Sequence, residues 1–324
     1  MSIMVPSYAY TYIKIGFLKE LIMEEEELKQ LDSIMNIEDL INQITPFFPD
    51  IKINEYTIEE IEKSLFHVYI KLLGRILSVS PENMRDFLRN YLLKYEIINI
   101  KQIILGSILG LSKEEKRSNV NFLVEEYLEK KEFIENLLNI TNLDEIQLYM
   151  RDTMYNEVIR EGITYFRNNN EVFVLEAFLD NFYYLNLLTG QGSFEKYEKE
   201  VITSYIFMST EIYNLNVLYR GIINSIDKKL LAQFIVDNTF LLKESTLYVL
   251  LEQSNLDEFF RIFNQQLSQK GLLRGLFKPV KKDSEDPIWE IEDLYTNYFF
   301  QKFKFHYEEL EYMTIFKILE ILIK

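Results

Sequence analysis

Residues 91–110 read YLLKYEIINIKQIILGSILG, and a related stretch returns twice further along the chain. The aliphatic residues of this stretch recur at steps of three and four, which predicts a helix buried on nearly all sides. Asn99 is a polar exception within it. A buried side-chain amide needs hydrogen-bond partners, so we expect Asn99 to be held by a fixed neighbour.

The second copy matches the first position for position. Glu96, Ile97, Asn99, Ile100, Ile103 and Gly106 correspond to Glu211, Ile212, Asn214, Leu215, Leu218 and Gly221. A third, weaker copy keeps the acid at Glu311 but has Thr314 in place of the asparagine and Ile321 in place of the glycine. Short matches of this kind arise by chance in helical proteins, so the repeat needs a second, independent pattern.

That second pattern is an asparagine followed by an aliphatic residue and two acids. It occurs at 36–40 (NIEDL), 142–146 (NLDEI) and 255–259 (NLDEF), ahead of the three copies and in the same order. Each is typical of a helix start, with asparagine as the N-cap and Asp39, Glu145 or Glu258 at the capping-box position. One such start is ordinary, but two patterns paired three times in order predict an internal repeat.

The repeat divides the 324 residues into three lobes, which we place at 5–113, 114–225 and 226–324. Glycines number ten and prolines six, and no proline occurs between Pro81 and Pro279. Scarce helix breakers predict an all-α fold with short connections. The longest irregular stretch, 277–287 (FKPVKKDSEDP), is predicted to be a mobile charged loop, either a docking loop or a solvated one.

Bulk charge and composition exclude several classes of protein. The formal charge of −16 disfavours binding to nucleic acid and anionic headgroups and favours basic protein partners. The absence of cysteine excludes disulfides and thiolate metal sites and fits a reducing compartment. No apolar run of 18 residues and no signal-peptide pattern occurs, so we expect no membrane-spanning segment.

Known catalytic motifs are missing as well. His67 and His306 are the only histidines, and neither lies in a zinc, di-iron or nucleophile-elbow motif. The glycines of 190–192 (GQG) lack the rest of a nucleotide-binding fingerprint. We therefore predict no catalytic residue, no metal and no cofactor. An enzyme would need convergent acids in a pocket, a feature that no sequence pattern here indicates.

The segments 92–106 (LLKYEIINIKQIILG) and 209–221 (STEIYNLNVLYRG), with 36–40 and the turn 44–48 (ITPFF), resemble the family of C subunits of A/V-type rotary ATPases, whose eukaryotic members are called d subunits. The resemblance covers nearly the whole chain. It implies three similar helical lobes in a pseudo-three-fold funnel. The third lobe departs from the pattern at Thr314 and Ile321.

The same resemblance implies a non-catalytic central-stalk rotor subunit. Such a part links the central shaft to the membrane proteolipid ring and transmits torque between ATP hydrolysis or synthesis and H⁺ or Na⁺ transport. It implies a peripheral position at the cytoplasmic face of the membrane and no directly bound nucleotide. The alternative is a helical-repeat scaffold that binds a basic cytosolic partner, which would predict a shorter period of roughly 34 to 47 residues.

Polar residues of the repeated helices are the candidate site. We expect them near the seams between lobes or on the funnel wall, with simple intramolecular hydrogen bonds and ion pairs as the competing interpretation. They are Glu96, Asn99, Lys101, Glu211, Asn214, Arg220 and Glu311.

Overall fold

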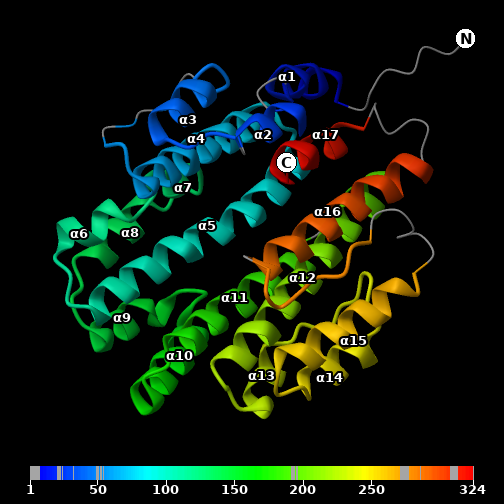
Figure 1. Ribbon diagram of the computed structural model, residues 1–324. Coiled ribbons are helices and arrows are strands. Elements are labelled where there is room, and N and C mark those ends of the chain that lie inside the picture. Colours follow the sequence, from blue (N-terminus) through cyan, green and yellow to red (C-terminus); the bar gives the residue numbers. More distant parts are fainter. Residues whose placement is uncertain are drawn as a thin grey trace, which may run out of the picture. The chain divides into compact units, whose positions relative to one another are not determined.

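The computed structural model describes residues 8–19, 23, 25–31, 33–48, 51, 53, 55–190, 194, 196–270, 277–284, 286–306 and 313–323. Within these ranges every regular element is a helix: the α-helices α1 to α17 and one short 3-10 helix, η1 (Figure 1). The predicted all-α fold class is therefore confirmed. The predicted three-lobe arrangement stays a prediction, and the chain separates into two compact units.

Unit 1 comprises Met1–Ile103, Ser112–Asn139 and Glu311–Lys324. It therefore joins the first part of the chain to its last helix. Its helices are α1 (Ala9–Lys19), α2 (Glu25–Leu31), α3 (Ile37–Ile44), α4 (Ile58–Val79), most of α5 (Glu82–Ile108), α6 (Lys113–Ser118), α7 (Phe122–Tyr127), α8 (Lys131–Leu138) and α17 (Thr314–Ile323).

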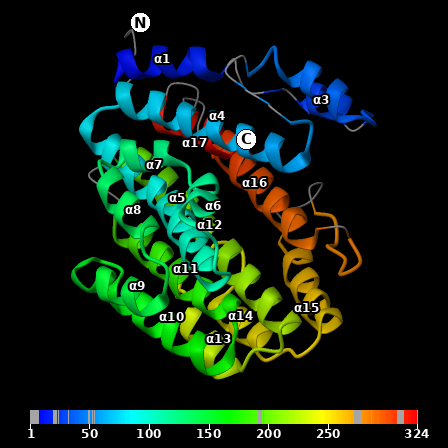
Figure 2. The ribbon, with the colours of Figure 1, turned by 90° about the vertical axis from the view of Figure 1, so that its left-hand side faces the viewer.

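The packing of α17 in unit 1 brings the two ends of the described chain together. This helix lies against α1, and α1 lies against α4, as two views show (Figures 1 and 2). Lys19 pairs with Glu320 at 2.7 Å, and the amino group of Lys317 lies 3.6 Å from the ring centre of Tyr12. Helix α17, the third copy of the repeated helix, is thus bound to α1, the first helix of the described chain.

Unit 2 comprises Ile104–Leu111 and Ile140–Leu310. Its elements, after the end of α5, are α9 (Leu143–Tyr149), η1 (Met150–Asp152), α10 (Asn156–Asn169), α11 (Val172–Thr189), α12 (Lys196–Ile223), α13 (Lys228–Phe234), α14 (Glu244–Leu251), α15 (Leu256–Ser268) and α16 (Pro287–His306).

Helix α12 is the centre of unit 2. It contacts α11, α13, α14, α15 and α16. Ile202, Ile206 and Leu215 along its length are fully buried. This burial on all sides agrees with the pattern of apolar residues, which has no single hydrophobic face. Polar groups inside such a helix must find partners within the protein.

The three predicted asparagine N-caps are confirmed. The side-chain oxygens of Asn36, Asn142 and Asn255 each accept a hydrogen bond at 2.9 Å from the backbone N–H three residues later. The reciprocal capping-box bond is recorded at another helix, between Ser112 and Glu115. Asp39 instead accepts a hydrogen bond from the Asn36 amide at 2.7 Å.

Helix α4 begins after Thr57, and α5 runs without a break from Glu82 into the repeated stretch. Helix α1 ends at Lys19 and buries Thr11 and Ile15, and α2 starts at Glu25. Among the described helices, none is both long and apolar enough to cross a membrane.

Candidate functional site

Two polar clusters lie inside the protein where the repeated helices meet the segment that follows them in the chain. Glu96 and Asn99 on α5 belong to the first junction, and Glu211 and Asn214 on α12 to the second. All four side chains are at most 1% exposed. Polar side chains this deeply buried need hydrogen-bond partners within the protein, and the two junctions supply different partners.

The asparagines make the same two-point clamp in both junctions. The Asn99 amide donates to the Asn121 carbonyl at 3.1 Å, and its oxygen accepts from the Asn121 N–H at 2.9 Å. Asn214 does the same to Val236, with both distances 2.9 Å. The partner lies 22 residues further on in each case. Each clamp satisfies both backbone polar groups of one residue. The partner predicted for the buried Asn99 is therefore present.

A third clamp of this kind occurs on α15. Asn264 donates to the Val280 carbonyl at 2.8 Å and accepts from the Val280 N–H at 3.0 Å. Val280 lies in the stretch 277–287, where Lys282 also pairs with Asp257 at 2.7 Å. The described part of this stretch is therefore held at Val280, which is buried and clamped, and the mobility of the stretch stays a prediction.

The first junction contains two buried carboxyl groups and one lysine. Glu96 accepts from Lys130 at 2.8 and 3.0 Å. Glu125 on α7 accepts from the Asn99 amide at 2.8 Å, while its other oxygen is buried with no hydrogen-bond partner. Burial raises the pKa of Glu125 to about 8, against the lowering effect of the Asn99 hydrogen bond. Burial, with a smaller contribution from the nearby charge of Glu96, thus favours the protonated form of Glu125 at neutral pH.

In the second junction the carboxylate is held mainly by backbone groups. Glu211 accepts from the backbone N–H groups of Phe240, Leu241 and Leu242, the last two at 2.9 Å. It also accepts from the Tyr295 hydroxyl at 2.6 Å. Burial raises the pKa of Glu211, and these four donors lower it. Here a nest of N–H dipoles takes the place of the lysine.

Both repeated helices end in the same way. Gly110 adopts a left-handed φ of 71°, and the Leu111 N–H donates to the Gly106 carbonyl at 2.8 Å. After α12, Ser225 has φ 53°, and the Ile226 N–H donates to the Gly221 carbonyl at 2.9 Å. These are Schellman-type ends. A Cβ at Gly110 would meet nothing within 4 Å, so its φ, and not close packing, is the reason for the glycine.

The remaining candidate residues are placed differently. Arg220 pairs with Glu176 on α11 at 2.9 Å and lies over the ring of Phe173. Lys101 is half-buried on α5, and Glu311 lies outside the described residues. The partners of Glu96, Asn99, Glu211 and Asn214 lie beyond the predicted lobe boundaries in the chain, whereas those of Arg220 lie within its own predicted lobe. The role of the whole set at seams or a funnel wall stays a prediction.

Three site residues were missed by sequence reasoning. Asn264 carried a signal, because it stands in step with Phe260 and Leu267 on the apolar side of α15. Glu125 and Tyr295 carried none, because an acid beside another acid and a tyrosine among phenylalanines are ordinary. His67, which lies in none of the motifs considered, is exposed on α4. Among the described residues no group of three His, Asp or Glu side chains could hold a metal ion.

Comparison with known proteins gives a consistent result. The chain is 24% identical to the C subunit of the A-type ATP synthase from Methanosphaera stadtmanae over 258 residues, which are 77% of this chain and 64% of that protein. It is 23% identical to the protein of the same name from Methanocaldococcus jannaschii over 237 residues, 70% of this chain and 57% of that protein. It therefore spans less than two thirds of the length of these relatives.

The family comparison covers more of the chain than the individual relatives do. The ATP synthase (C/AC39) subunit family matches residues 14–321, which include both junctions and all three copies of the repeated helix. Because the match extends over nearly the whole chain, this protein belongs to the ATP synthase (C/AC39) subunit family.

Proposed function

We propose that the protein is a non-catalytic rotor subunit of the central stalk of an A/V-type ATP synthase. It links the central shaft to the membrane proteolipid ring and transmits torque between ATP hydrolysis or synthesis and H⁺ or Na⁺ transport. It does so as a peripheral subunit at the cytoplasmic face of the membrane. Family membership and the names of the matched relatives support a role in such a complex.

The observation that carries the proposal is the order in which each repeated helix contacts the start of another repeat. Helix α5 is clamped to the start of the second repeat at Asn121, and α12 to the start of the third at Val236. Helix α17, the third copy, packs against α1 at the start of the first. These contacts join each predicted lobe to the next and the third to the first, which supports a role as one connected part.

Torque transmission requires stiffness, and the junctions are built to resist shear. Each clamp is directional and lies in a closely packed interior, so sliding a helix along its neighbour would break two hydrogen bonds together. The buried carboxylates add fixed contacts beside each clamp. Such joints suit a mechanical coupler better than a binding scaffold, whose repeats contact one another through interchangeable apolar faces.

The test is reconstitution. The tagged chain is incubated with detergent-solubilised membranes of its source that lack it, and the bound proteins are identified by mass spectrometry. We expect recovery of the proteolipid ring together with shaft and nucleotide-binding subunits and, once the complex is returned to sealed vesicles, restored coupling of ATP hydrolysis to ion transport. Retention of soluble proteins alone would contradict the proposal and favour the scaffold.

A further inference from the structure

Helix α7 and its flanking residues are joined to α5 by the two polar side chains of the first junction. The Asn99 amide group donates both to the Asn121 carbonyl at 3.1 Å and to the Glu125 carboxyl at 2.8 Å. Glu96, one turn earlier on α5, accepts from Lys130. Along the chain, Glu125 therefore lies between the clamp and the ion pair, and it shares one amide group with the clamp.

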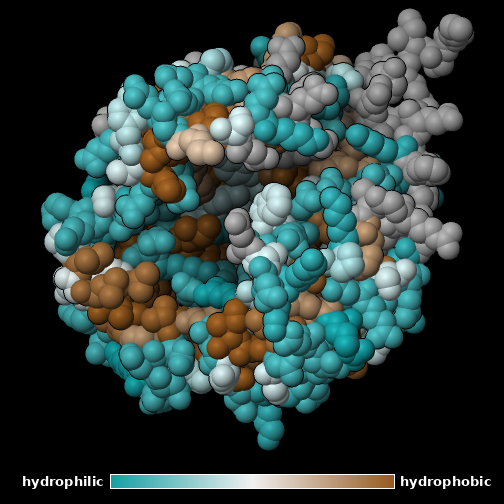
Figure 3. Space-filling model, viewed as in Figure 1, coloured by the Kyte–Doolittle hydropathy of each residue, from teal (hydrophilic) through white to brown (hydrophobic). Residues whose placement is uncertain are grey.

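The surroundings of Glu125 suit a neutral carboxyl group. Most of the face seen in Figure 3 is hydrophilic, as expected of a chain with 51 acids, but the Glu125 side chain is fully buried. Its Oε2 atom has no hydrogen-bond partner. Lys130 already donates to both oxygens of Glu96. Loss of the proton in the closed junction would therefore leave a buried, charged oxygen without a donor, which is costly.

The charged groups around α7 give Glu125 no cation of its own. Burial raises the pKa of Glu125 to about 8, the Asn99 hydrogen bond lowers it, Glu96 raises it and Lys130 lowers it. Other charged or titratable side chains on the helices that pack against α7 have other neighbours. They are Lys71 and Arg75 of α4, which act on Tyr127, Lys63 and His67 of α4, which line a groove beside Asn121, Lys131 of α8, which pairs with Glu126, and Glu135 of α8, which pairs with Arg117.

The second junction has donors where the first lacks them. Both oxygens of Glu211 accept hydrogen bonds, from three backbone N–H groups and from the Tyr295 hydroxyl. An ionised Glu211 therefore keeps its partners at both oxygens. Its ionisation gives no reason for the clamp between Asn214 and Val236 to open.

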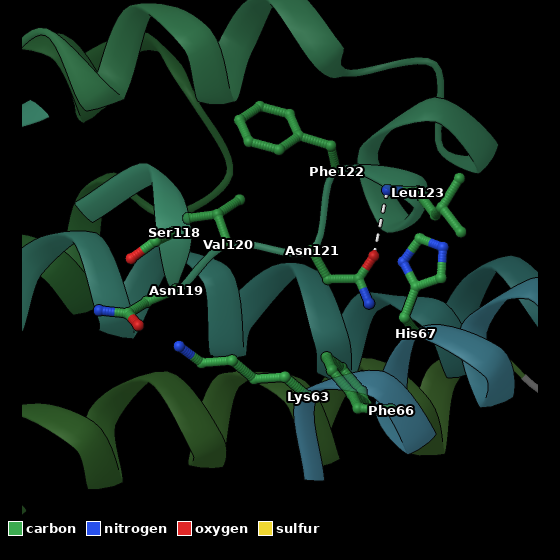
Figure 4. Close-up of a pocket in the computed structure, with 9 residues that line it drawn as sticks. All are labelled: Lys63, Phe66, His67, Ser118, Asn119, Val120, Asn121, Phe122 and Leu123. Carbon is green, nitrogen blue, oxygen red and sulfur yellow. Dashed lines mark hydrogen bonds between the residues drawn. The ribbon is translucent and has the colours of Figure 1, made fainter. Parts of the chain in front are cut away.

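Helix α7 is short enough to detach without the rest of the protein. It has six residues, too few for a helix to be stable by itself. Figure 4 shows Asn121, just before α7, in the wall of a groove of about 370 Å³, with its side-chain oxygen bonded to the Leu123 N–H. Asn121 is only half-buried. Water therefore reaches the clamp after a small displacement, as in local opening of a folded protein.

We infer that Glu125 makes the first junction a proton-controlled joint. With the carboxyl protonated, the clamp between Asn99 and Asn121 is closed. When the proton passes to water, the carboxylate turns to solvent and α7 separates from α5, while the rest of the protein stays folded. This inference concerns the chain alone and does not depend on the proposed function. In a part that transmits torque, such a joint would make stiffness depend on pH.

Hydrogen exchange of the purified full-length chain tests this inference. The protection factor of each amide, its intrinsic exchange rate divided by the observed rate, is measured between pH 4.5 and about 8, the ordinary and the folded pKa of Glu125. The Asn121 protection factor should fall by up to about tenfold per pH unit, because opening releases one proton over this range. The Val280 N–H, held by the Asn264 side chain, is the internal control and should lose far less protection. Equal falls at the two amides would mean unfolding of the whole chain and would overturn the inference.

A matched pair of variants identifies the group that titrates. Glu125→Gln keeps an acceptor for the Asn99 amide and stays neutral, so the Asn121 protection factor should no longer depend on pH. Glu126→Gln, at the exposed neighbouring position, should keep the wild-type dependence. An unchanged dependence in Glu125→Gln would overturn the inference.

The carboxyl ¹³C signal of Glu125 in the wild-type chain gives a second measurement that needs no substitution. The fall in Asn121 protection should level off at the pH where this signal titrates. Titration of the signal near the ordinary value of 4.5 would overturn the inference.

Discussion

The first and second junctions share one sequence motif and differ in how they neutralise a buried acid. Glu96 faces the Lys130 ammonium, whose side chain is 36% exposed, whereas Glu211 faces three backbone N–H groups and a buried tyrosine. The first junction therefore contains a partly exposed charge, whereas Leu241, Leu242 and Tyr295 of the second are buried. A shared motif specifies that a carboxylate is buried at this point, but the surrounding segments decide the electrostatics.

Removing the acid from each junction should give the largest contrast. Glu211→Ala leaves three N–H groups and the Tyr295 hydroxyl buried without an acceptor, so we expect a loss of about 4 kcal/mol in the free energy of unfolding. Glu96→Ala should cost about 2 kcal/mol, because Lys130 can turn to solvent. Urea unfolding measures both. Equal losses would show that solvent access at Lys130 does not matter.

The asparagine clamps should differ in the same direction. Asn214→Ala leaves the backbone N–H and C=O groups of the buried Val236 without their hydrogen-bond partner. We expect a loss of about 3 kcal/mol in the free energy of unfolding. Asn99→Ala should cost about 2 kcal/mol, since Asn121 is half-buried and water can reach it. Hydrogen exchange of the Val236 and Asn121 amides gives a local readout. A larger rise in exchange rate at Asn121 than at Val236 would contradict the expectation that the second clamp contributes more to stability than the first.

The raised pKa values of Glu125 and Glu211 should make stability fall as pH rises, and Glu125 in the first junction provides the test. The Glu125 pKa is about 8 in the folded protein and 4.5 for an ordinary glutamate, so between these pH values the folded state binds a proton that the unfolded state does not. Stability present below pH 4.5 is then lost as pH rises through 8, at up to about 1.4 kcal/mol per pH unit.

Glu125→Gln, which stays neutral, should remove the part of this slope that is due to Glu125 and gain about 5 kcal/mol at pH 9 while changing little at pH 4. Unfolding free energies measured across this range provide the check. The exposed Glu126→Gln is the matched control and should leave the slope in place. A wild-type profile parallel to that of Glu125→Gln would mean that Glu125 is ionised at neutral pH.

Substitutions at the two helix ends should give the smallest changes in the free energy of unfolding, and the two changes should have opposite signs. Gly110→Ser places a side chain at a left-handed φ and should cost about 1 kcal/mol. Ser225→Gly relieves the same strain after α12 and should gain about 0.5 kcal/mol, reduced by the greater freedom of glycine when unfolded. Thermal unfolding resolves the difference. Changes of the same sign would indicate that the two ends differ in conformation in solution.

In each junction the asparagine of the repeated helix could be predicted from the sequence, but its partners could not. Asn99 and Asn214 were identifiable, because a polar residue in a fully apolar helix must be satisfied. Their partners Asn121 and Val236 are bound through backbone groups, which every residue carries, so no side-chain pattern identifies them. Glu125 and Tyr295 come from other helices, and their roles depend on which of their faces those helices bury.

By itself the sequence determined the helical class, the three asparagine caps and the burial of the repeated helices, because these depend on periodicity and on contacts within a few residues. The tertiary structure alone decided that Lys130 neutralises Glu96 while backbone N–H groups hold Glu211, and that Asn264 holds a stretch that composition marks as mobile. The physical reason is that electrostatic and hydrogen-bond partners are chosen by distance in space, which local sequence does not encode.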